Sequence, residues 1–560
     1  MIDRIRKYTL AVLGILTVFA VSAQQQVNCD YIIDSSTVSI TNYHASPGDT
    51  MCLEAGVRPH LYLKNIVGSE ENPVVIINHQ GKSIIESDLS YGIKFAACRY
   101  IQLTGAGVDS IHYGIDINRA SGGNGLKIGG KSSDFEVNNL EISNTKYEGI
   151  VAKTDPDCTF SAVRDSFTMY NVIIHDNYIH NTGTEGMYIG NSFFLGHILV
   201  ACDTVVLPHI IDGVQIYRNR VEYAGWDGIQ VGCALHQCDI YDNYIYKDSQ
   251  AEKTYQMSGI MINTGSSCNA YNNKIIDGQG SGIVVQGTGG QKYYNNLIVN
   301  AGRNYDFNEQ ILKQQFGIFC KYKYLAPPDS SFAFYNNTII NPKSDGIRFM
   351  NPESRNNKFS NNLIINPGAY IYYDTNGSVN TSAEDAYIHN YLDQSEMTMT
   401  NNIFSLDVEQ QYFADMENYD FHLTFQSPAF NVGTNLLNAG ISFDLDGNPR
   451  PYDRYFDIGA YELQSAADVI EQYKLLDVSI YPNPFFADTH LRLHFQEPQI
   501  IQASIYNNMG FKMMLFSDLH FNAGEEYDMI LHLNFLAPGF YYLNIVDGKS
   551  STTIKLIKVQ

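Results

Sequence analysis

The sequence predicts an all-β fold, in which a parallel β-solenoid is followed by a small antiparallel β-sandwich. Three observations support this prediction. A short motif that begins with glycine recurs through most of the chain. A second motif, centred on asparagine, recurs between the glycine motifs. Both motifs have ended by about residue 410, and after residue 475 longer runs of alternating apolar and polar residues begin.

The glycine motif consists of Gly, an apolar residue, any residue, and a further apolar or small residue. This alternation has the two-residue period of a short strand. The two motifs predict two strands per turn, one from each motif. Each strand is too short to bury a face by itself, so the core must form by stacking of the turns. The ten motifs begin at Gly92, Gly114, Gly125, Gly149, Gly186, Gly228, Gly259, Gly282, Gly317 and Gly346.

The asparagine motif has its own register. In four turns, eight positions separate the central Asn from the residue before the next glycine motif. Asn tolerates tight-turn backbone, and its amide can bond to the next Asn up the stack, so we expect a structural role. Cys238 and Cys268 each lie five residues before such an Asn, so they should stack as thiols or as a disulfide. The central residues are Asn177, Asn219, Asn243, Asn273, Asn296, Asn337, Asn362 and Asn402.

The composition excludes one class of function. The chain has 36 basic and 59 acidic residues, which gives a net charge of −23. Nucleic-acid binding needs a basic surface, so this charge argues against it. A polyanionic ligand would need basic residues or a cation gathered at its site. All nine cysteines follow Ala23, and their odd number leaves at least one without an intramolecular partner.

Residues 1–23 have the features of a secretory signal peptide. Arg4, Arg6 and Lys7 precede an apolar run, and small residues lead up to Ala23 as a cleavage site. An N-terminal membrane anchor is the alternative, although the run is short for a membrane span. We therefore expect an exported protein with no transmembrane segment after cleavage.

The two motifs together resemble the right-handed parallel β-helix family, the pectin-lyase-like superfamily of secreted carbohydrate-active proteins. The resemblance covers about residues 30 to 410, and it implies a β-helix with an N-terminal cap over residues 24–410. The stretches SPAFNVGTN and FDLDGNPRPYDRYFDIGAYEL resemble a closing segment, at 411–463. This fold hosts lyases, hydrolases, epimerases and non-catalytic adhesins, so the resemblance implies a fold and leaves activity open.

The end of the chain resembles the C-terminal sorting domain of type IX secretion cargo. The motif YPNP spans Tyr481–Pro484, APGFYYLNI spans Ala537–Ile545, and the last strand contains Lys555 and Lys558. We expect a linker at 464–475 and the sorting sandwich at 476–560. The resemblance implies the type IX machinery as a partner and a secreted or outer-surface location. A carbohydrate-binding accessory sandwich is the alternative.

Four insertions interrupt the repeat, and long loops on a rigid scaffold often carry function. Two of them, at 154–167 and 191–212, follow the glycine strand on adjacent turns. The other two, at 246–257 and 301–316, precede it on later turns. All four flank the same strand, so we expect a groove over the glycine strands.

The alternation of the glycine strands predicts the floor of this groove. An exposed file that contains Tyr, Met and Phe suits stacking against sugar rings, although the loops could instead cover it as a secondary core. The file is Val151, Tyr188, Gln230, Met261, Val284, Phe319 and Arg348, with Lys153 and Lys321 one pleat later. From this surface the predicted substrate-binding residues are Tyr188, Gln230, Trp226, Phe319, Lys321 and Arg348.

Acidic residues precede the glycine on three successive turns, at Glu148, Glu185 and Asp227, and again at Asp345. Carboxylates stacked about 5 Å apart cannot all stay ionised without help. One could have a raised pKa and act with a neighbour as a glycosidase pair, a calcium ion could lie between them, or each could pair with a base or face water.

The predicted catalytic residues are Glu148, Glu185, Asp227 and Lys153. Related sugar lyases use a basic residue to remove a proton, and Lys153, Lys321 and Arg348 are the bases that the predicted floor supplies. His175, His180 and Tyr188 are further acid/base candidates. No cofactor is certain. The DLDGN stretch at 444–448 is a weak calcium signal, because Tyr455 stands where an EF-hand loop needs Glu.

The leading hypothesis is an exported β-helix protein that engages polysaccharide along this groove, as a polysaccharide lyase, a glycoside hydrolase or a binder. The alternative is a non-catalytic surface adhesin or glycan-binding structural protein. We expect a monomer in either case.

Overall fold

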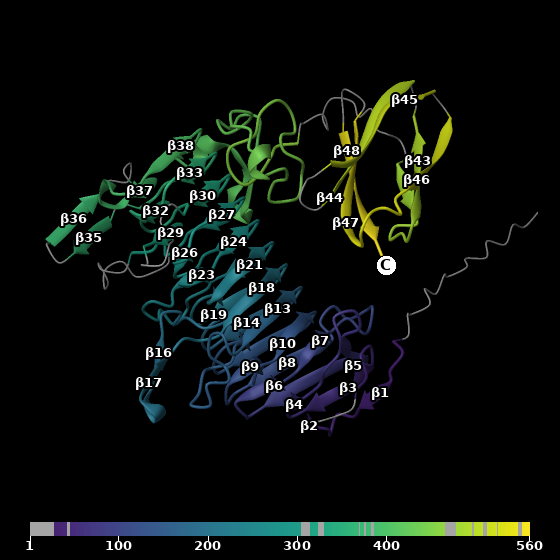
Figure 1. Cartoon of the computed structure of the whole chain (residues 1–560). Helices are drawn as coiled ribbons and strands as arrows, with labels where there is room; N and C mark the ends of the chain where they lie inside the picture. Colours follow the sequence, from purple (N-terminus) through teal and green to yellow (C-terminus); the bar gives the residue numbers. More distant parts are fainter. Residues whose placement is uncertain are drawn as a thin grey trace, which may run out of the picture.

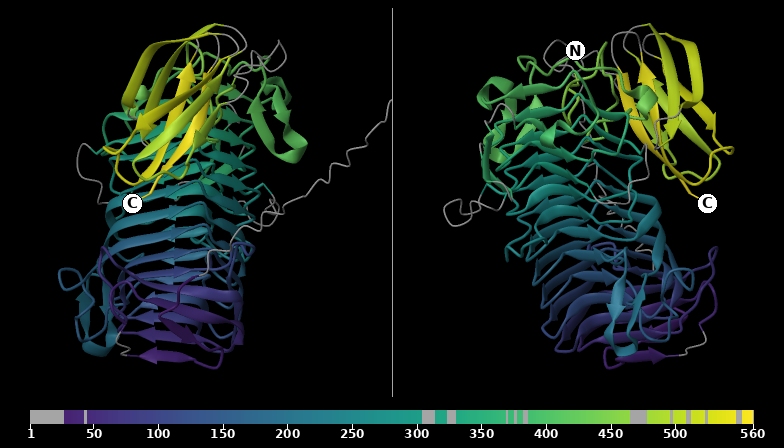
Figure 2. Two further views of the ribbon diagram at one scale, coloured as in Figure 1. Left: turned by 90° about the vertical axis from the view of Figure 1, so that its right-hand side faces the viewer. Right: turned by 60° about the vertical axis from the view of Figure 1, so that its left-hand side comes forward.

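The computed structural model describes residues 27–41, 45–303, 314–322, 330–368, 370–374, 377–381, 386–464, 478–495, 498–507, 512–522, 525–546 and 551–559. The predicted signal peptide and nearly all of the predicted linker lie outside these residues. Figure 1 shows a solenoid of stacked strands that runs from the N-terminal turns to the green C-terminal turns, with a separate yellow sandwich at the end of the chain. Figure 2 shows the sandwich beside the C-terminal turns of the solenoid.

Each regular turn of the solenoid contains three parallel strands, where the motifs had predicted two. The asparagine motif bends at a corner, so one strand precedes the central Asn and another follows it. The residue just before the Asn adopts a positive φ, as at Asp176 (53°), Arg218 (51°) and Asn272 (54°), and this conformation makes the corner. We call the first set of strands the upstream ladder, the second the downstream ladder, and the glycine strands the Gly-strand sheet. The predicted glycine motif at Gly114 is an exception, because its strand pairs within the downstream ladder.

The upstream ladder contains β1 (Tyr31–Ile33), β3 (Thr50–Arg58), β5 (Val74–Ser87), β7 (Arg99–Thr104), β10 (Ser133–Asn138), β13 (Thr168–His175), β18 (Ile210–Tyr217), β21 (Ala234–Tyr241), β24 (Cys268–Tyr271), β27 (Gln291–Tyr294), β30 (Phe332–Tyr335), β33 (Asn357–Ser360) and β38 (Met397–Thr400). The downstream ladder contains the later parts of β3 and β5, then β8 (Ile115–Ala120), β11 (Leu140–Thr145), β14 (Tyr178–Thr182), β19 (Arg220–Ala224), β22 (Tyr244–Tyr246), β25 (Lys274–Ile276), β28 (Leu297–Val299), β31 (Thr338–Ile340), β34 (Leu363–Ile365) and β39 (Ile403–Ser405).

The Gly-strand sheet contains β2 (Ser39–Thr41), β4 (Leu61–Lys64), β6 (Tyr91–Ala96), β9 (Asn124–Gly129), β12 (Ile150–Ala152), β15 (Met187–Ile189), β20 (Ile229–Val231), β23 (Ser258–Ile262), β26 (Ser281–Val285), β29 (Ile318–Lys321), β32 (Ile347–Met350) and β37 (Ile388–Asn390). Outside the three stacks lie the hairpins β16 (His197–Leu199) with β17 (Thr204–Val206), β35 (Tyr370–Asp374) with β36 (Gly377–Thr381), and β40 (Phe413–Asp415) with β41 (Asp420–Leu423). Short 3-10 turns are η1 (Val200–Cys202), η2 (Tyr391–Asp393), η3 (Glu409–Gln411), η4 (Met416–Asn418) and η5 (Leu437–Ala439).

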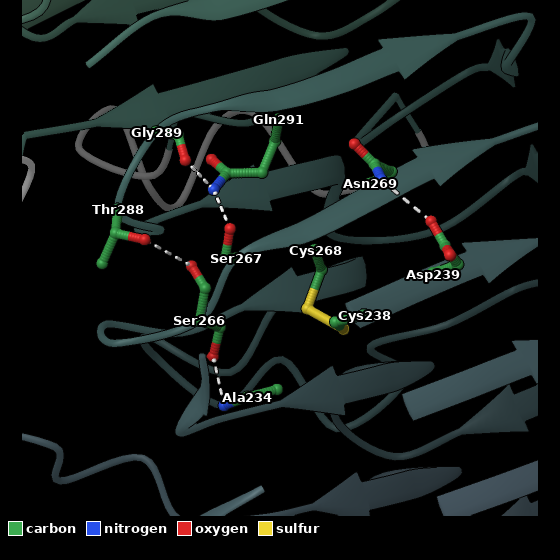
Figure 3. The surroundings of a disulfide bond; sticks show 10 residues. All are labelled: Ala234, Cys238, Asp239, Ser266, Ser267, Cys268, Asn269, Thr288, Gly289 and Gln291. Carbon is green, nitrogen blue, oxygen red and sulfur yellow. Dashed lines mark hydrogen bonds between the residues drawn. A yellow bond between two sulfur atoms is a disulfide. The ribbon is translucent and has the colours of Figure 1, made fainter. Parts of the chain in front are cut away.

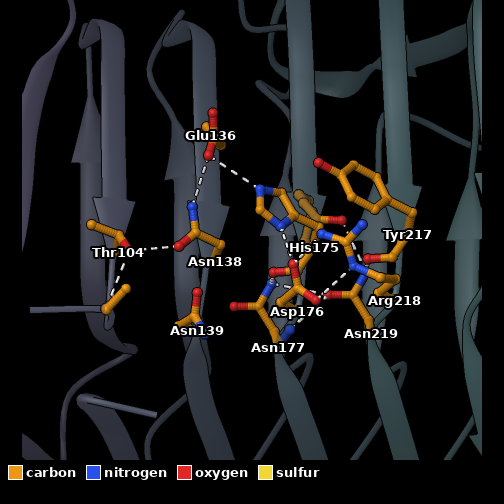
Figure 4. Close-up of polar contacts among 12 residues, drawn as sticks. Thr104, Glu136, Asn138, Asn139, His175, Asp176, Asn177, Tyr217, Arg218 and Asn219 are labelled. Carbon is orange, nitrogen blue, oxygen red and sulfur yellow. Dashed lines mark hydrogen bonds and ion pairs between the residues drawn. The ribbon is translucent and has the colours of Figure 1, made fainter. Parts of the chain in front are cut away.

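The central asparagines form a continuous hydrogen-bonded ladder, as the sequence predicted. From Asn219 onward, the side-chain oxygen of each central Asn accepts from both the backbone N–H and the side-chain amide of the Asn one turn before, whereas the Asn177 oxygen accepts from the backbone N–H of Leu140. At Asn273 these bonds are 3.1 and 3.0 Å long and come from Asn243. Asn273 in turn donates to Asn296 and to the carbonyl of Ile240, so no polar atom of its side chain is left without a partner. Figure 4 shows one such step, from Asn177 to Asn219.

Close approach between turns explains the recurrent glycine. A Cβ on Gly186 would lie 2.5 Å from the carbonyl oxygen of Gly228, and one on Gly317 would lie 2.4 Å from that of Gly346. A side chain at this position would push the turns apart. The residues after these glycines point inward and form a file of buried isoleucine and methionine in the main core, for example Met187, Ile229 and Ile260.

Three disulfides brace the solenoid. Cys238 and Cys268 lie opposite each other on β21 and β24 and are bonded, which settles the alternative that the sequence left open (Figure 3). A second bond, between Cys158 and Cys202, joins two of the predicted insertions to each other. The third joins Cys29 to Cys52 at the N-terminal turns. Cys98, Cys233 and Cys320 are buried free thiols.

The segment at 411–463 lies along the outer face of the downstream ladder. Its Phe421, Leu423 and Ile458 pack on Leu297 and Leu363, which point outward from that ladder. Further N-terminal on the same face, Glu141 and Tyr178 are polar and partly exposed. A second apolar core, outside the solenoid, therefore covers the downstream ladder on its C-terminal turns.

The C-terminal module is an antiparallel sandwich with its own core. One sheet contains β42 (Ser479–Tyr481), β43 (Asp488–His494) and β46 (Glu526–His532). The other contains β44 (Gln499–Asn507), β45 (Lys512–Phe521), β47 (Gly539–Val546) and β48 (Ser551–Lys558). Asn483 of the YPNP motif donates to the carbonyl of Lys555 at 2.7 Å and accepts from the N–H of Ile557 at 2.8 Å. These bonds link the first and the last sequence motif of the module.

We predict that Asn273→Ala lowers the free energy of unfolding by roughly 2–4 kcal/mol, because it removes the acceptor of two buried donors on Asn243. Thermal unfolding of the full chain, followed by circular dichroism, measures the loss. Asn118→Ala is the matched control, since Asn118 is exposed and makes one long surface contact. Equal shifts in the two variants would contradict a stabilising role for the ladder.

Candidate functional site

The outward residues of the Gly-strand sheet follow the register that the sequence predicted. Consecutive strands pair Val151 with Tyr188, Tyr188 with Gln230, and Gln230 with Met261. The same file continues through Val284, Phe319 and Arg348. The predicted floor is therefore one continuous row of side chains along the solenoid.

Most of this row is covered by the inserted loops. Val151, Gln230, Met261, Val284 and Arg348 are buried, whereas Tyr188 and Phe319 are half-buried. The open aromatic strip that the sequence suggested is therefore largely a secondary core, as the alternative interpretation had it. The alternation fixed which side chains point outward, but the paths of the loops decided which of them meet solvent.

A pocket remains open over the C-terminal half of the row, with a volume of about 540 Å³. Its apolar lining consists of Met257, Met261, Val284, Phe316, Phe319 and Met350. Two tyrosines, Tyr255 and Tyr391, also line it, and Tyr255 is 86% exposed. The remaining functional groups are the hydroxyls of Thr254 and Ser281, the amides of Gln286, Gln314 and Gln315, and the cations Lys321 and Arg348. Among these described lining residues there is no carboxylate.

Arg348 is held firmly in this pocket. Its Nε donates to Asp345 Oδ2 at 2.6 Å and its Nη1 donates to Gln314 Oε1 at 2.8 Å. The guanidinium carbon lies 4.8 Å from the centre of the Phe316 ring. Burial raises the pKa of Asp345 to about 7, against the opposing effect of Arg348. The guanidinium is thus oriented before any ligand binds.

The pocket brings together three of the predicted substrate-binding residues, Phe319, Lys321 and Arg348. Tyr188, Gln230, Trp226 and Lys153 lie on other turns and are not part of its lining. Gln230 is buried under the loops, and Trp226 lies in the preceding turn with the Lys253 ammonium 5.5 Å from its ring centre.

Lys153 and Tyr188 form a separate polar pair between the first two insertions. The Lys153 ammonium lies 4.5 Å from the centre of the Tyr188 ring and 3.0 Å from Asp155 Oδ1. The hydroxyl of Tyr188 donates to Ser192 Oγ at 3.0 Å. Burial lowers the pKa of Lys153, but the neighbouring Tyr188 and Asp155 outweigh it and the net pKa is raised. Lys153 is therefore a cation at neutral pH and a poor base in this state.

The acidic residues stack on successive turns as predicted, but Glu185 and Asp227 are buried and do not face open water. Backbone bonds join Gly149 to Glu185 and Gly186 to Asp227 on successive turns. Glu148 is half-buried and accepts from the amide of Asn124. Glu185 and Asp227 are only 1% and 0% exposed. The interpretation in which these acids are simply solvated is therefore wrong for Glu185 and Asp227.

Burial shifts the ionisation of these acids strongly. Burial, with a further contribution from the charge of Glu148, raises the pKa of Glu185 to about 7. Burial raises the pKa of Asp227 well above its ordinary range, and the charges of Glu185 and Asp248 add to the effect. Asp227 Oδ1 accepts from Ser258 Oγ at 2.6 Å, while Oδ2 of Asp227 and Oε2 of Glu185 lack a hydrogen-bond partner. A carboxyl with a pKa near 7 suits proton transfer at neutral pH, but a substrate would reach Glu185 only after the loops move.

The two histidine candidates lie outside the groove. His175 projects from the upstream ladder, where Nδ1 is 2.5 Å from Asp176 and Nε2 is 3.1 Å from Glu136 (Figure 4). Burial lowers the pKa of His175, but the bonds to Asp176 and Glu136 raise it overall. His180 projects from the downstream ladder, stacked on Tyr178 at 4.3 Å. Neither contacts the Gly-strand sheet, because both strands face other sides of the solenoid.

The DLDGN loop does not fit a calcium ion. Asp444 Oδ1 accepts from the backbone N–H groups of Asp446 and Asn448, and Oδ2 accepts from that of Glu462. Glu462 accepts from two further backbone N–H groups and lies 3.4 Å from Arg450 Nη1. Backbone donors and an arginine therefore already occupy the oxygens that a cation would need.

Sequence reasoning missed the residues that shape the pocket away from its floor: Tyr255, Gln286, Gln315 and Tyr391. Gln286 stands on the same outward pleat as Lys321, so the alternation could have identified it. Tyr255 lies within a predicted insertion, but nothing in the repeat indicates which loop residue turns back over the sheet. The insertion at 301–316 lies partly outside the described residues.

We predict that Glu185→Gln flattens the pH dependence of stability. The folded-state pKa lies above the unfolded value, so ionisation of Glu185 costs stability as the pH rises from about 4.3 to about 7. The variant should be more stable than the parent by roughly 1–3 kcal/mol at pH 8, with little difference at pH 4.

Thermal unfolding from pH 4 to pH 8 measures this effect. Glu70→Gln is the control, because Glu70 is exposed. An unchanged slope in Glu185→Gln would show that the carboxyl ionises freely in the folded protein.

Two family models match this chain. Residues 209–404 match the model described as a right-handed β-helix region. Residues 479–559 match the secretion system C-terminal sorting domain. No curated protein matches the chain. The described residues contain no helix long and apolar enough to cross a membrane.

Two solved structures show a distant likeness to this chain. An alginate lyase from Paenibacillus sp. str. FPU-7 is 14% identical, with a TM-score of 0.31, over 54% of this chain and 93% of that chain. XylC in complex with xylose is 12% identical, with a TM-score of 0.36, over 91% of this chain and 95% of that chain. Both likenesses are too distant to carry a functional argument. The stacked sheets and the two family matches, however, agree along the chain: this protein is a right-handed parallel β-helix protein with a type IX secretion C-terminal sorting domain, exported to the cell surface or the extracellular space.

Proposed function

We propose that the protein binds an acidic polysaccharide outside the cell, in the pocket over β23, β26, β29 and β32. The observation that carries this proposal is the placement of Lys321 and Arg348 beside aromatic side chains in the same pocket. Carboxylate-bearing sugars need both a cation for the carboxylate and an apolar surface for the ring.

The local charge supports an anionic ligand. The chain carries a net charge of −23, yet the described lining of the pocket has two cations and no acid. A preoriented guanidinium binds a carboxylate well, because its fork of N–H groups matches the two oxygens. The two cations therefore give the pocket a local charge opposite in sign to that of the whole chain.

Tyr255 supports a sugar as the ligand. Its side chain stands at the pocket and is 86% exposed, and its backbone adopts a φ of 68°, which is rare for a bulky residue. The base of its loop is tied down by backbone bonds from Gln250 to Ala224 and from Ala251 to Gly225. An exposed aromatic ring at the pocket offers a surface on which a sugar ring can stack.

Catalysis by Glu148, Glu185, Asp227 and Lys153 stays a prediction, as does the choice between lyase and hydrolase. Binding without catalysis, as in an adhesin, is the second candidate. It is favoured by the burial of Glu185 and Asp227 and by the distance of these acids from the pocket lining.

A glycan screen tests the proposal. The chain from residue 24 onward would be tested against neutral and uronate polysaccharides by calorimetry, with reducing ends and unsaturated uronates measured in parallel. Binding to uronate glycans without product supports the adhesin. Product formation supports an enzyme. Binding to neutral glycans alone would contradict the proposal.

We predict that Lys321→Ala weakens binding of a uronate oligosaccharide by about 5- to 20-fold at low salt, because a charge-assisted bond is lost. The difference should shrink at high ionic strength. Calorimetric titration at two salt concentrations measures both effects. Lys358→Ala is the control, because Lys358 is exposed on β33 of the upstream ladder. Equal affinities for the parent and Lys321→Ala would place the ligand elsewhere.

A further inference from the structure

We infer that the sugar residue that enters this pocket carries an acetyl substituent. The inference rests on the proposed function and names the ligand more closely. It follows from the apolar depth of the pocket and from the position of two amide groups within it.

The deep part of the pocket is poorly suited to bare sugar hydroxyls. Met257, Met261, Val284 and Phe316 line it, and each is buried. Hydroxyl groups that leave water without new partners cost free energy, so an unsubstituted pyranose would have to give up hydrogen bonds here. A methyl group, in contrast, gains by packing against thioether sulfur and an aromatic ring.

Two amide donors project among these apolar side chains. Gln286 Nε2 donates to Met261 Sδ at 3.8 Å, and Gln315 Nε2 donates to Met257 Sδ at 3.7 Å. A thioether sulfur is a weak acceptor, so a carbonyl oxygen placed here would make a stronger bond with either N–H group. Amide N–H donors next to methionine side chains suit a ligand group with one carbonyl oxygen and one methyl, such as an acetyl group.

The second of these amides is held in place by its neighbours. Gln315 Oε1 accepts from Ser281 Oγ at 2.9 Å, and the backbone N–H of Gln315 donates to Ser344 Oγ at 3.3 Å. These bonds orient the Gln315 N–H group toward the pocket without a ligand. A preoriented donor adds to selectivity because the analogue that lacks the carbonyl leaves the donor with its weak partner.

Size and charge fit the same ligand. The volume of about 540 Å³ lies within the range of pockets that hold small ligands, roughly 300–1,000 Å³. Lys321 and Arg348 line the same pocket as the methionine side chains, so a glycan carboxylate and an acetyl group could be bound side by side. O-acetyl esters and N-acetyl amides share this chemistry, so matched ligands must separate them.

The test uses the full chain and paired oligosaccharides. One pair is an O-acetylated uronate oligosaccharide and the same material after mild alkaline deacetylation. The other is an N-acetylated acidic oligosaccharide and its de-N-acetylated form. We expect at least one acetylated ligand to bind about tenfold more tightly than its partner, as the added methyl burial and one hydrogen bond imply.

Gln286→Met should reduce this preference to about two- to threefold, because it removes one donor while keeping the volume of the side chain. Gln410→Met, at an exposed position in η3, should leave the preference unchanged. The ratio between paired ligands is the readout, so a general loss of affinity does not affect it.

The outcomes separate the two proposals. Binding of acidic oligosaccharides with no acetyl preference overturns this inference and leaves the proposed function standing. An acetyl preference that stays at about tenfold in Gln286→Met overturns the assignment to this pocket. Failure of every acidic glycan to bind the parent chain overturns both.

Discussion

The stacking of one turn on the next is the constraint on which the rest of this structure depends. The turns approach so closely at the glycine strands that no Cβ fits, and the asparagines bond through the interior of the corner from turn to turn. Each turn is too small to bury a face of its own, so the register of every strand follows from its neighbours. This rigidity places outward side chains in straight files along the Gly-strand sheet.

The repeat determines which side chains point outward from the Gly-strand sheet, and the loops determine which of these side chains are buried. Val151 and Gln230 occupy the same outward file as Phe319, yet the loops bury the first two and leave the third at a pocket. The disulfide between Cys158 and Cys202 ties the two N-terminal insertions together over this side of the solenoid. The segment at 411–463 covers the downstream ladder in a comparable way, with an external apolar core. The inserted loops and the segment at 411–463 therefore determine which parts of the solenoid are exposed to solvent.

Burial also divides the charged residues into two groups with different chemistry. Glu185 and Asp227 are withdrawn from water and favour the protonated state near neutral pH. Arg348 is also buried, but bonds to Asp345 and Gln314 hold it at the pocket. The pocket thus combines an oriented arginine with apolar side chains; of the predicted acids, Asp345 lies beside it, whereas Glu185 and Asp227 lie on turns nearer the N-terminus. The cations of the lining are the physical basis of the proposed preference for acidic glycans.

The sequence by itself determined the β-helix, the asparagine ladder, the pairing of Cys238 with Cys268 as neighbours, and the order of the outward file. These features depend on periodicity, and each period repeats the same local contacts. The third strand of each turn was missed, although the residue with positive φ at the corner is Asp or Asn in all of the eight asparagine motifs except the one with Arg218, and these residue types tolerate that conformation. Nor did the sequence determine the whole pocket. The outward positions of Phe319, Lys321 and Arg348 follow from the alternation of the strands, but Tyr255 and Gln315 belong to loops that have no repeating pattern. Only the tertiary structure decided which outward residues are buried, because loop paths depend on contacts between residues far apart in the chain.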